Sequence, residues 1–360
     1  MSEKTETLEN GKLPFDARIL DGLPDPVFAV DRKYRIVDAN RAALDLFGAD
    51  AVGLDFAASP ISKPILDTVK IVLEGTAIRR SEVEFPPPVS RTYELNLWRL
   101  PGLKSTGPAW VIVVLHDMTA LRRAEQMRAD FVSNVSHEMR SPLSSLLGFI
   151  ETLRGPARDD PEATNRFLRI MEDEAKRMTR LINDLLILSK VEAGEHILPE
   201  GAVNMGNLMT QVANILSVRA HDRDMKITIE QPATALLAKG DPDELVQVFQ
   251  NLVSNAVSYG RKDSPVRVVV AAVEAMPSTR RAGVSVAVTN QGEGIPAEDI
   301  PRLTERFYRV DKGRSRSMGG TGLGLAIVKH IVARHRGVLD IQSTPGKDTC
   351  LTVYLPAAEG

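Results

Sequence analysis

The stretch MGGTGLGLAIVKHIV at residues 318–332 decides how the C-terminal part of the chain folds. It places four glycines before an apolar run of helical period: Gly319, Gly320, Gly322 and Gly324. The sequence therefore predicts a glycine-rich loop that opens a helix over 322–336. The amides of such a loop, with the positive end of the helix dipole, suit a polyphosphate. The loop lacks the GK[ST] of a Walker A motif and does not open a first βαβ unit, so neither of those fingerprints explains it.

Two more polar patterns lie in the same region. Asn251 and Asn255 stand one turn apart on a helix predicted over 241–260, where two amides can present oxygens to a metal or a phosphate. The motif NQGEGIP supplies Gly292 and Gly294 after a predicted strand, a turn that lets the backbone approach a flat ligand closely. A flexible hinge is the alternative for the glycine loop taken by itself. Together, the three patterns favour a ligand site.

Helices and strands alternate in the domain expected over 203–360. Helices predicted over 203–219, 241–260 and 322–336 interleave with the β-rich runs MKITIE, VRVVVAAV, GVSVAVTN, VLDIQS and CLTVYL. This order predicts an α/β sandwich with helices on one face of a mixed sheet.

Two long helices are predicted over 119–195. After Thr119 the chain has no Pro or Gly until Pro142, and apolar residues recur three or four positions apart: Met127, Phe131, Val135, Met139, Leu143, Leu146 and Ile150. The polar stretch GPARDDPEAT breaks this helix, and a second apolar stripe follows: Phe167, Ile170, Met171, Met178, Leu181, Ile182, Leu185 and Leu188. The pattern predicts an antiparallel hairpin. A hairpin buries only part of each stripe, so we expect a second copy to complete a dimeric four-helix bundle.

His137 lies in the middle of the first of these helices, within FVSNVSHEMRSPLSSLLGF. A neutral imidazole is a good nucleophile near pH 7, and Glu138 beside it could accept the proton of the other ring nitrogen. Pro142 would bend the helix just past the histidine and expose it. A lone helical histidine is more often structural or solvated, and the other histidines are assigned to that class: His116, His196, His221, His330 and His335.

The first 118 residues differ from the rest in their pattern of apolar and turn-forming residues. Residues 1–15 are expected to be a flexible N-terminus, and 16–118 mix short β-like runs with short helices, which predicts a small α+β sensor-like domain. Pro86, Pro87 and Pro88 predict a loop between two strands.

Composition narrows the function classes. The 360 residues carry 45 Lys and Arg against 47 Asp and Glu, and a net charge of −2 disfavours direct binding to nucleic acid. Cys350 is the single cysteine, so no internal disulfide can form, and no Cys/His cluster has zinc-ligand spacing. Neither a signal peptide nor an apolar run of membrane-spanning length is present, which predicts a cytoplasmic chain without a transmembrane segment. Association with a membrane-bound partner is compatible with this prediction.

From about 120 to 357 the sequence resembles the sensor histidine kinases of two-component systems. The likeness rests on several boxes in order: VSHEMRSPL, NLVSNA, NQGEGIP, ERFYRV, GGTGLGLAIVKHIV and STPGKDTCLTVYLP. The first domain is similar to a PAS domain, with HDMT leading into a signalling helix. The resemblance implies a multidomain α+β chain with a PAS-like domain, a dimerising helical hairpin and an ATP-binding α/β sandwich of the GHKL type.

The resemblance also implies roles for single residues, with ATP and Mg²⁺ as cofactors. His137 would take the γ-phosphoryl group, Glu138 would act as its base, and Ser141 would serve a phosphatase activity. Asn255 would hold Mg²⁺ and Asn251 would support it. The remaining nucleotide-binding positions would be Tyr259, Asn290, Gly292, Gly294, Ile295, Phe307, Gly320, Thr321, Gly322, Leu323, Gly324 and Thr349.

Two positions depart from the family pattern. Asn290 stands where the family has an Asp that accepts a hydrogen bond from adenine, so the charge-assisted strength of that bond is lost. Ser141 stands where the family often has Thr. A sensor scaffold that binds ATP poorly, or a chain that acts mainly as a phosphatase, is therefore the alternative function. A gyrase- or chaperone-like ATPase is a third, which the His137 hairpin disfavours.

The resemblance implies partners as well. The chain contains no receiver-like domain, so the phosphoryl group would pass to an aspartate of a separate response regulator. The hairpin implies a homodimer. Within the family, the chain looks most like the phosphate-responsive kinases, which implies a response regulator of phosphate control and a transporter-associated signalling partner.

Overall fold

The computed structural model describes residues 17–53, 55, 63–75, 78–85, 90–100, 110–194, 197–277, 279–311 and 320–358. The predicted N-terminal segment 1–15, the predicted loop at 86–88 and His196 lie outside these residues. The chain forms two compact units, Met1–Val132 and Ser133–Gly360, which are described separately.

The first unit holds a five-stranded antiparallel sheet in the order β2-β1-β5-β4-β3. Its elements are η1 (Ala17–Gly22), β1 (Val27–Val30), β2 (Ile36–Ala39), α2 (Arg41–Phe47), α3 (Lys63–Glu74), β3 (Ile78–Phe85), β4 (Arg91–Leu100) and β5 (Trp110–Asp117). Tyr93, Leu95 and Leu97 alternate along β4 and are buried in a core that α3 covers. Asn40 caps α2 by accepting from the amide of Ala43, and it is fully buried. The predicted α+β sensor-like fold is confirmed.

Two long helices follow, α4 (Thr119–Arg154) and α5 (Pro161–Ala193). Asp160 caps α5 by accepting from the amides of Glu162 and Ala163, and Pro161 takes the first helical position, where its missing N–H costs nothing. Pro142 lies inside α4, which continues through it. The predicted hairpin is confirmed.

The hairpin leaves many apolar side chains exposed within a single chain. Leu181 and Leu188 of α5 are buried, but a larger set is exposed: Leu143, Leu147, Ile150, Leu168, Ile170, Ile182 and Leu186. Leu143, Leu147 and Ile150 share one face of α4, and Leu168, Ile182 and Leu186 share one face of α5, so these six form exposed stripes, and Ile170 lies off the stripe of α5.

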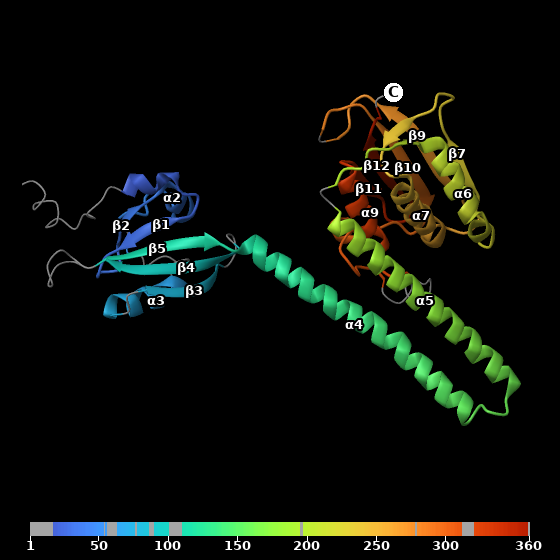
Figure 1. Ribbon diagram of the computed structural model, residues 1–360, viewed down its shortest axis with the longest axis horizontal. Helices are drawn as coiled ribbons and strands as arrows, with labels where there is room; N and C mark the ends of the chain where they lie inside the picture. Colours follow the sequence, from blue (N-terminus) through green and yellow to red (C-terminus); the bar gives the residue numbers. More distant parts are fainter. Residues whose placement is uncertain are drawn as a thin grey trace, which may run out of the picture. The chain divides into compact units, whose positions relative to one another are not determined.

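The C-terminal part of the second unit is a two-layer structure of helices on a sheet (Figure 1). Its elements are β6 (Ala202–Asn204), α6 (Met205–His221), β7 (Ile227–Glu230), β8 (Leu237–Lys239), α7 (Pro242–Tyr259), β9 (Val266–Val273), β10 (Gly283–Gln291), η3 (Ile300–Arg302), α9 (Gly324–Arg334), β11 (Val338–Ser343) and β12 (Asp348–Pro356). The sheet order is β11-β12-β10-β9-β7, with β7 and β9 parallel and the other pairs antiparallel.

Helices α6, α7 and α9 cover one face of this mixed sheet, and α7 lies between the other two. Buried side chains alternate along the central strand at Val284, Val286, Val288 and Asn290, which fixes the face that points toward the helices. The predicted α/β sandwich is confirmed, with helix ends that differ from the prediction by one or two residues.

No helix in the described ranges is both long enough and apolar enough to cross a membrane.

Candidate active site

His137 is exposed on α4, and Ser141 is exposed one turn further along the same helix. Pro142 follows at once and is buried against the hairpin. A proline has no N–H to give to the carbonyl four residues earlier, so the helical hydrogen-bond ladder is interrupted at residue 138, next to the histidine. The imidazole is therefore accessible at a point where the helix is weakened.

Glu138 points toward two arginines. Arg177 of α5 donates to its Oε2 at 2.6 Å, and Arg309 lies 3.5 Å from the same oxygen. The side chains of both arginines are less than a tenth exposed, at 8% and 6%. Buried guanidinium groups need a carboxylate partner, so this cluster fixes the position of Glu138.

Asn251 and Asn255 lie one turn apart on α7, as predicted from their spacing, and Tyr259 ends the helix. Asn251 faces the start of α9, because a Cβ built on Gly324 would lie 3.2 Å from its Oδ1. Its Nδ2 is buried, and among the described residues it finds no hydrogen-bond partner. An orphaned buried amide donor at this position is an observation that favours a bound acceptor such as a phosphate oxygen.

The loop that follows β10 is held by backbone hydrogen bonds to the turn before β12. The amide of Gly292 donates to the carbonyl of Lys347 at 2.9 Å, and the amide of Gly346 donates to the carbonyl of Glu293 at 2.7 Å. Gly294 has φ +69°, and a Cβ there would lie 2.3 Å from the carbonyl oxygen of Thr344. Only glycine fits this position.

Asn290 and Thr349 lie opposite each other on β10 and β12, and both are buried. Ser343 connects this pair to the loop, because its Oγ lies 2.7 Å from Oγ1 of Thr349 and accepts from the amide of Ile295 at 3.0 Å. Asn290, Thr349 and Ile295 are therefore brought together, as the resemblance implies.

The glycine loop closes around the segment of Phe307. The amide of Phe307 donates to the carbonyl of Gly322 at 2.8 Å, and both residues have positive φ, +63° and +75°. A Cβ on Gly322 would lie 2.9 Å from Cα of Phe307. Gly320 and Thr321 precede this contact, Leu323 caps α9, and Gly324 begins it. The first amides of α9 have no intrahelical acceptor, as at any helix N-terminus, so they are available to an anion.

Thr321 connects the glycine loop to the hairpin. Its Oγ1 donates to Oδ2 of Asp184 on α5 at 2.6 Å and accepts from the amide of Leu323 at 3.3 Å. Burial raises the pKa of Asp184, and the hydrogen bond from Thr321 offsets part of that rise. A second contact between the same parts joins Glu192 of α5 to Arg306.

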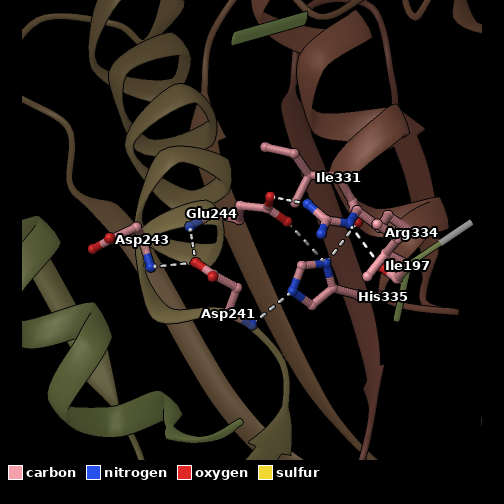
Figure 2. A network of polar contacts seen from close by, with 7 residues as sticks. All are labelled: Ile197, Asp241, Asp243, Glu244, Ile331, Arg334 and His335. Carbon is pink, nitrogen blue, oxygen red and sulfur yellow. Dashed lines mark hydrogen bonds and ion pairs between the residues drawn. The ribbon is translucent and has the colours of Figure 1, made fainter. Parts of the chain in front are cut away.

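A buried polar network joins the start of α7, the end of α9 and the segment after α5 (Figure 2). His335 donates from Nδ1 to the carbonyl of Ile331 at 2.8 Å and accepts at Nε2 from the amide of Asp241 at 3.0 Å, so its ring is neutral. Burial lowers the pKa of His335. Arg334 pairs with Glu244 and donates to the carbonyl of Ile197 at 3.0 Å. The network therefore fixes the helix that carries Asn251 and Asn255 against the helix that begins at Gly324.

Sequence reasoning missed several of these residues: Arg177, Asp184, Glu192, Glu244, Arg309 and Arg334. Each works through an ion pair or hydrogen bond with a partner far away in the sequence. The sequence offers one indication of them. Arg177 and Asp184 are charged residues near the buried face of the amphipathic helix α5, where apolar residues are expected.

A cavity lies beside the end of β10 and the turn before β12. It measures about 580 Å³ and includes Arg261, Arg267, Thr289, Gln291, Lys347 and Cys350 in its lining. Thr289 and Gln291 alternate with Asn290 along β10 and point to the sheet face opposite the helices. Asn290 is the one residue that this cavity shares with the predicted nucleotide-binding positions.

Three family descriptions match the chain in order. Residues 17–79 match the PAS domain, residues 127–194 match the His Kinase A phospho-acceptor domain, and residues 240–359 match the histidine kinase-, DNA gyrase B- and HSP90-like ATPases.

Relatives with curated names are sensor kinases. The phosphate regulon sensor protein PhoR of Pseudomonas aeruginosa is 37% identical over 280 residues, which are 78% of this chain and 60% of that protein. The sensor protein kinase WalK of Staphylococcus aureus is 32% identical over 359 residues, 99% of this chain and 57% of that protein. The chain thus spans less than two thirds of the length of these relatives.

A solved structure of the histidine kinase ThkA in complex with the response regulator protein TrrA matches 96% of this chain and 99% of that chain, with a TM-score of 0.52 at 22% identity. At this identity the likeness shows the fold. The order of the three domains, the curated relatives and this fold agree, and the chain belongs to the PAS-containing two-component sensor histidine kinases, with a PhoR-like sequence.

Proposed function

We propose that the chain is an ATP-dependent protein-histidine kinase that phosphorylates its own His137. The observation that carries the proposal is that an exposed histidine lies in the same compact unit as a helix N-terminus and a buried amide donor without a partner among the described residues. The first two features supply a nucleophile and a phosphate-binding surface, and Asn251 supplies a donor that a phosphate oxygen would satisfy.

The residues of the unit fit a nucleoside triphosphate with its metal ion. The amides of Gly322 and Gly324 would bind the phosphates, and the side-chain oxygen of Asn255 would hold Mg²⁺. Bound Mg²⁺ would supply charge neutralisation for the phosphoryl group in transit.

In the transfer, a ring nitrogen of His137 forms a bond to the γ-phosphorus while the bond from that phosphorus to the bridging oxygen breaks, and ADP leaves. The proton on the other ring nitrogen passes to Glu138. The imidazole must be neutral to attack, and an ionised Glu138 favours loss of that proton.

Glu138 can accept this proton only if it turns from its arginine partners toward the imidazole. Arg309 lies at the longer distance, 3.5 Å against 2.6 Å for Arg177, and it belongs to the segment beside the glycine loop. We therefore assign the observed arrangement to a resting state, from which the Arg309 segment withdraws before transfer.

The phosphoryl group would then pass to an aspartate of a separate response regulator. In that step the aspartate oxygen attacks phosphorus, the N–P bond breaks and His137 recovers its lone pair. Ser141 lies exposed one turn from His137, where its hydroxyl could orient a water that attacks the phosphorus of the aspartyl phosphate, so that the bond to the aspartate oxygen breaks and inorganic phosphate leaves the regulator.

A homodimer accounts for the exposed stripe of the hairpin. Leu147, Leu168 and Leu186 are exposed by half or more in the single chain, at 54%, 50% and 64%. A second copy packed on this stripe would bury it in a four-helix bundle.

Phosphate-responsive signalling is supported by the likeness to PhoR, and the likeness to WalK is of similar strength. We propose a PhoB-like response regulator as the acceptor and a transporter-associated protein as a further partner. A PAS-containing scaffold that binds ATP poorly is the competing function, because Asn290 lacks the charge of a carboxylate.

Phosphotransfer profiling tests the proposed function. The purified chain is incubated with γ-labelled ATP and Mg²⁺, freed of nucleotide, and mixed with each response regulator of its host. Rapid movement of label to one regulator supports a kinase, and a PhoB-like acceptor supports the phosphate pathway. Preference for another regulator contradicts the pathway alone, and a chain that never takes up label contradicts the kinase.

A further inference from the structure

Asn290 is a buried amide whose orientation is weakly determined. Its side chain is 5% exposed and lies on the sheet face that the helices cover. In the described part of the chain it makes one side-chain hydrogen bond, from Nδ2 to the neighbouring carbonyl of Gln291 at 3.4 Å. Such a long bond contributes little, so rotation of the amide by half a turn costs little as well.

The backbone around Asn290 is firmly held. Its strand pairs with Val266 of β9 on one side and Thr349 of β12 on the other. The next residue, Gln291, accepts from the amide of Arg261 at 2.7 Å, which places Asn290 beside the end of α7. A Cβ on Gly292 would lie 3.3 Å from Nδ2 of Asn290, so the glycine leaves room for the amide to turn. The backbone of Asn290 is therefore fixed, while its side-chain amide can present either its oxygen or its N–H groups.

An amide differs from a carboxylate in what it can recognise. An ionised carboxylate only accepts hydrogen bonds, whereas the asparagine amide offers an acceptor and a donor, exchanged by rotation. Adenine presents an amino donor at position 6, and guanine presents a carbonyl acceptor there. A carboxylate would attract the first and repel the second. An amide that turns freely can satisfy either base.

We propose that the nucleotide site accepts guanine as well as adenine nucleoside triphosphates, and that Asn290 is the residue responsible for this low selectivity between the two bases. The inference rests on the proposed function, because it places the base of the phosphate donor against Asn290. It extends that function by naming a second class of phosphate donor, GTP.

The test measures binding and labelling of the full chain side by side. The non-hydrolysable analogues of ATP and GTP are titrated calorimetrically with Mg²⁺, and autophosphorylation is followed with γ-labelled ATP and γ-labelled GTP. We expect the two dissociation constants, and the two kcat/KM values, to agree within about tenfold, since the amide can pair with the group at position 6 of either base.

Asn290→Asp supplies the contrast. It should weaken binding of the GTP analogue relative to the ATP analogue by a further factor of about ten or more, because a buried acceptor would face the guanine carbonyl. Asn214→Asp is the matched control, since it makes the same chemical change at an exposed position of α6. It should leave the ratio of the two constants unchanged.

The outcomes separate the inference from the function on which it rests. Binding and labelling with ATP, together with a preference over GTP of more than about tenfold in the wild-type chain, would overturn the inference and leave the kinase standing. Failure of both nucleotides to bind or label would overturn the kinase and the inference with it. The decisive comparison uses the wild-type chain, so it does not depend on how Asn290→Asp folds.

Discussion

Thr321 of the glycine loop donates a 2.6 Å hydrogen bond to Asp184 of the hairpin helix α5. The loop whose amides would bind phosphate is therefore held by a carboxylate, and a polyanion bound there would lie close to that carboxylate. Docking of the hairpin and binding of nucleotide should oppose each other, and by linkage each should weaken the other by the same factor.

Asp184→Asn should raise the affinity for ATP by about fivefold or more, because it keeps an acceptor for Thr321 and removes the negative charge. Calorimetric titration with a non-hydrolysable analogue measures the effect. Glu192→Gln is the control, since Glu192 also joins α5 to the C-terminal part of the unit, through Arg306, and among the described residues no ion pair or hydrogen bond joins it to Gly320–Gly324. An unchanged affinity in Asp184→Asn would show that the carboxylate does not oppose nucleotide binding.

The same substitution should not lower stability at neutral pH. The raised pKa of Asp184 means that the folded chain binds its proton more tightly than the unfolded chain does. The free energy of unfolding therefore decreases as pH rises from the ordinary Asp pKa of about 3.9 to the raised pKa of Asp184. Above the raised pKa the whole of this loss of stability is present. Asn carries no such penalty. A clear fall in melting temperature at pH 7 in Asp184→Asn would contradict this reading.

Arg177→Gln should destabilise the second unit by about 3 kcal/mol, because it leaves the partly buried carboxylate of Glu138 without its closer partner. Chemical denaturation followed by circular dichroism gives the value. The neighbouring Lys176→Gln removes an exposed pair with Glu172 and should cost less than about 1 kcal/mol. Equal costs for the two variants would mean that the Glu138 cluster contributes no more than a surface pair.

Gly322→Ala should cost about 2 to 3 kcal/mol and weaken nucleotide binding, since its Cβ would add a collision with Phe307 to the strain of a φ of +75°. Gly346 has a similar φ, +78°, and open space around its Cα. Gly346→Ala should therefore cost only about 1 kcal/mol and leave nucleotide affinity unchanged. Melting temperatures and titrations with nucleotide measure the stability and the affinity of both variants. Similar losses of affinity in the two would contradict a role for the contact between Gly322 and Phe307.

His335 should make the second unit less stable in mild acid. Its lowered pKa means that the unfolded chain takes up a proton first as pH falls. The stability tied to the neutral ring is fully present above the ordinary pKa of about 6.5 and is lost below it, with a slope of up to about 1.4 kcal/mol per pH unit. Three charged groups face the ring and affect its pKa. Glu244, whose Oε2 lies 3.9 Å from Nδ1, and Asp241 raise it, and Arg334 lowers it.

His335→Gln is the matched variant for that slope, because its amide can still donate to Ile331 and accept from Asp241 without titrating. Denaturation curves at pH 5 to 8 should show a shallower dependence in His335→Gln than in the wild-type chain. Parallel curves would mean that His335 does not titrate in this range.

The fold could be predicted from the sequence wherever local pattern carries the information. Apolar residues three or four positions apart predicted α4 and α5, and the β-rich runs predicted the strands of the C-terminal sheet. The glycine loop could be predicted because Gly322 and Gly294 have positive φ, a backbone conformation that other residues adopt at a cost.

The contacts that hold the site together could not be predicted in this way. Arg177 and Glu138 are 39 positions apart, and Arg334 and Glu244 are 90 positions apart. With 45 basic and 47 acidic side chains in the chain, no spacing singles out these pairs. These pairs form because α4 packs on α5 and α7 packs on α9. The sequence pattern predicts each helix separately and does not predict which helices pack together.

Labelling of His137 tests the central claim most directly. The full chain is incubated with γ-labelled ATP and Mg²⁺ at neutral pH, and the label is mapped by mass spectrometry beside the variant His137→Gln. The wild-type chain should carry an acid-labile phosphoryl group on His137, and His137→Gln should bind the nucleotide with unchanged affinity and carry no label. A wild-type chain that binds ATP and stays unlabelled, or a label that persists in His137→Gln, would contradict the account.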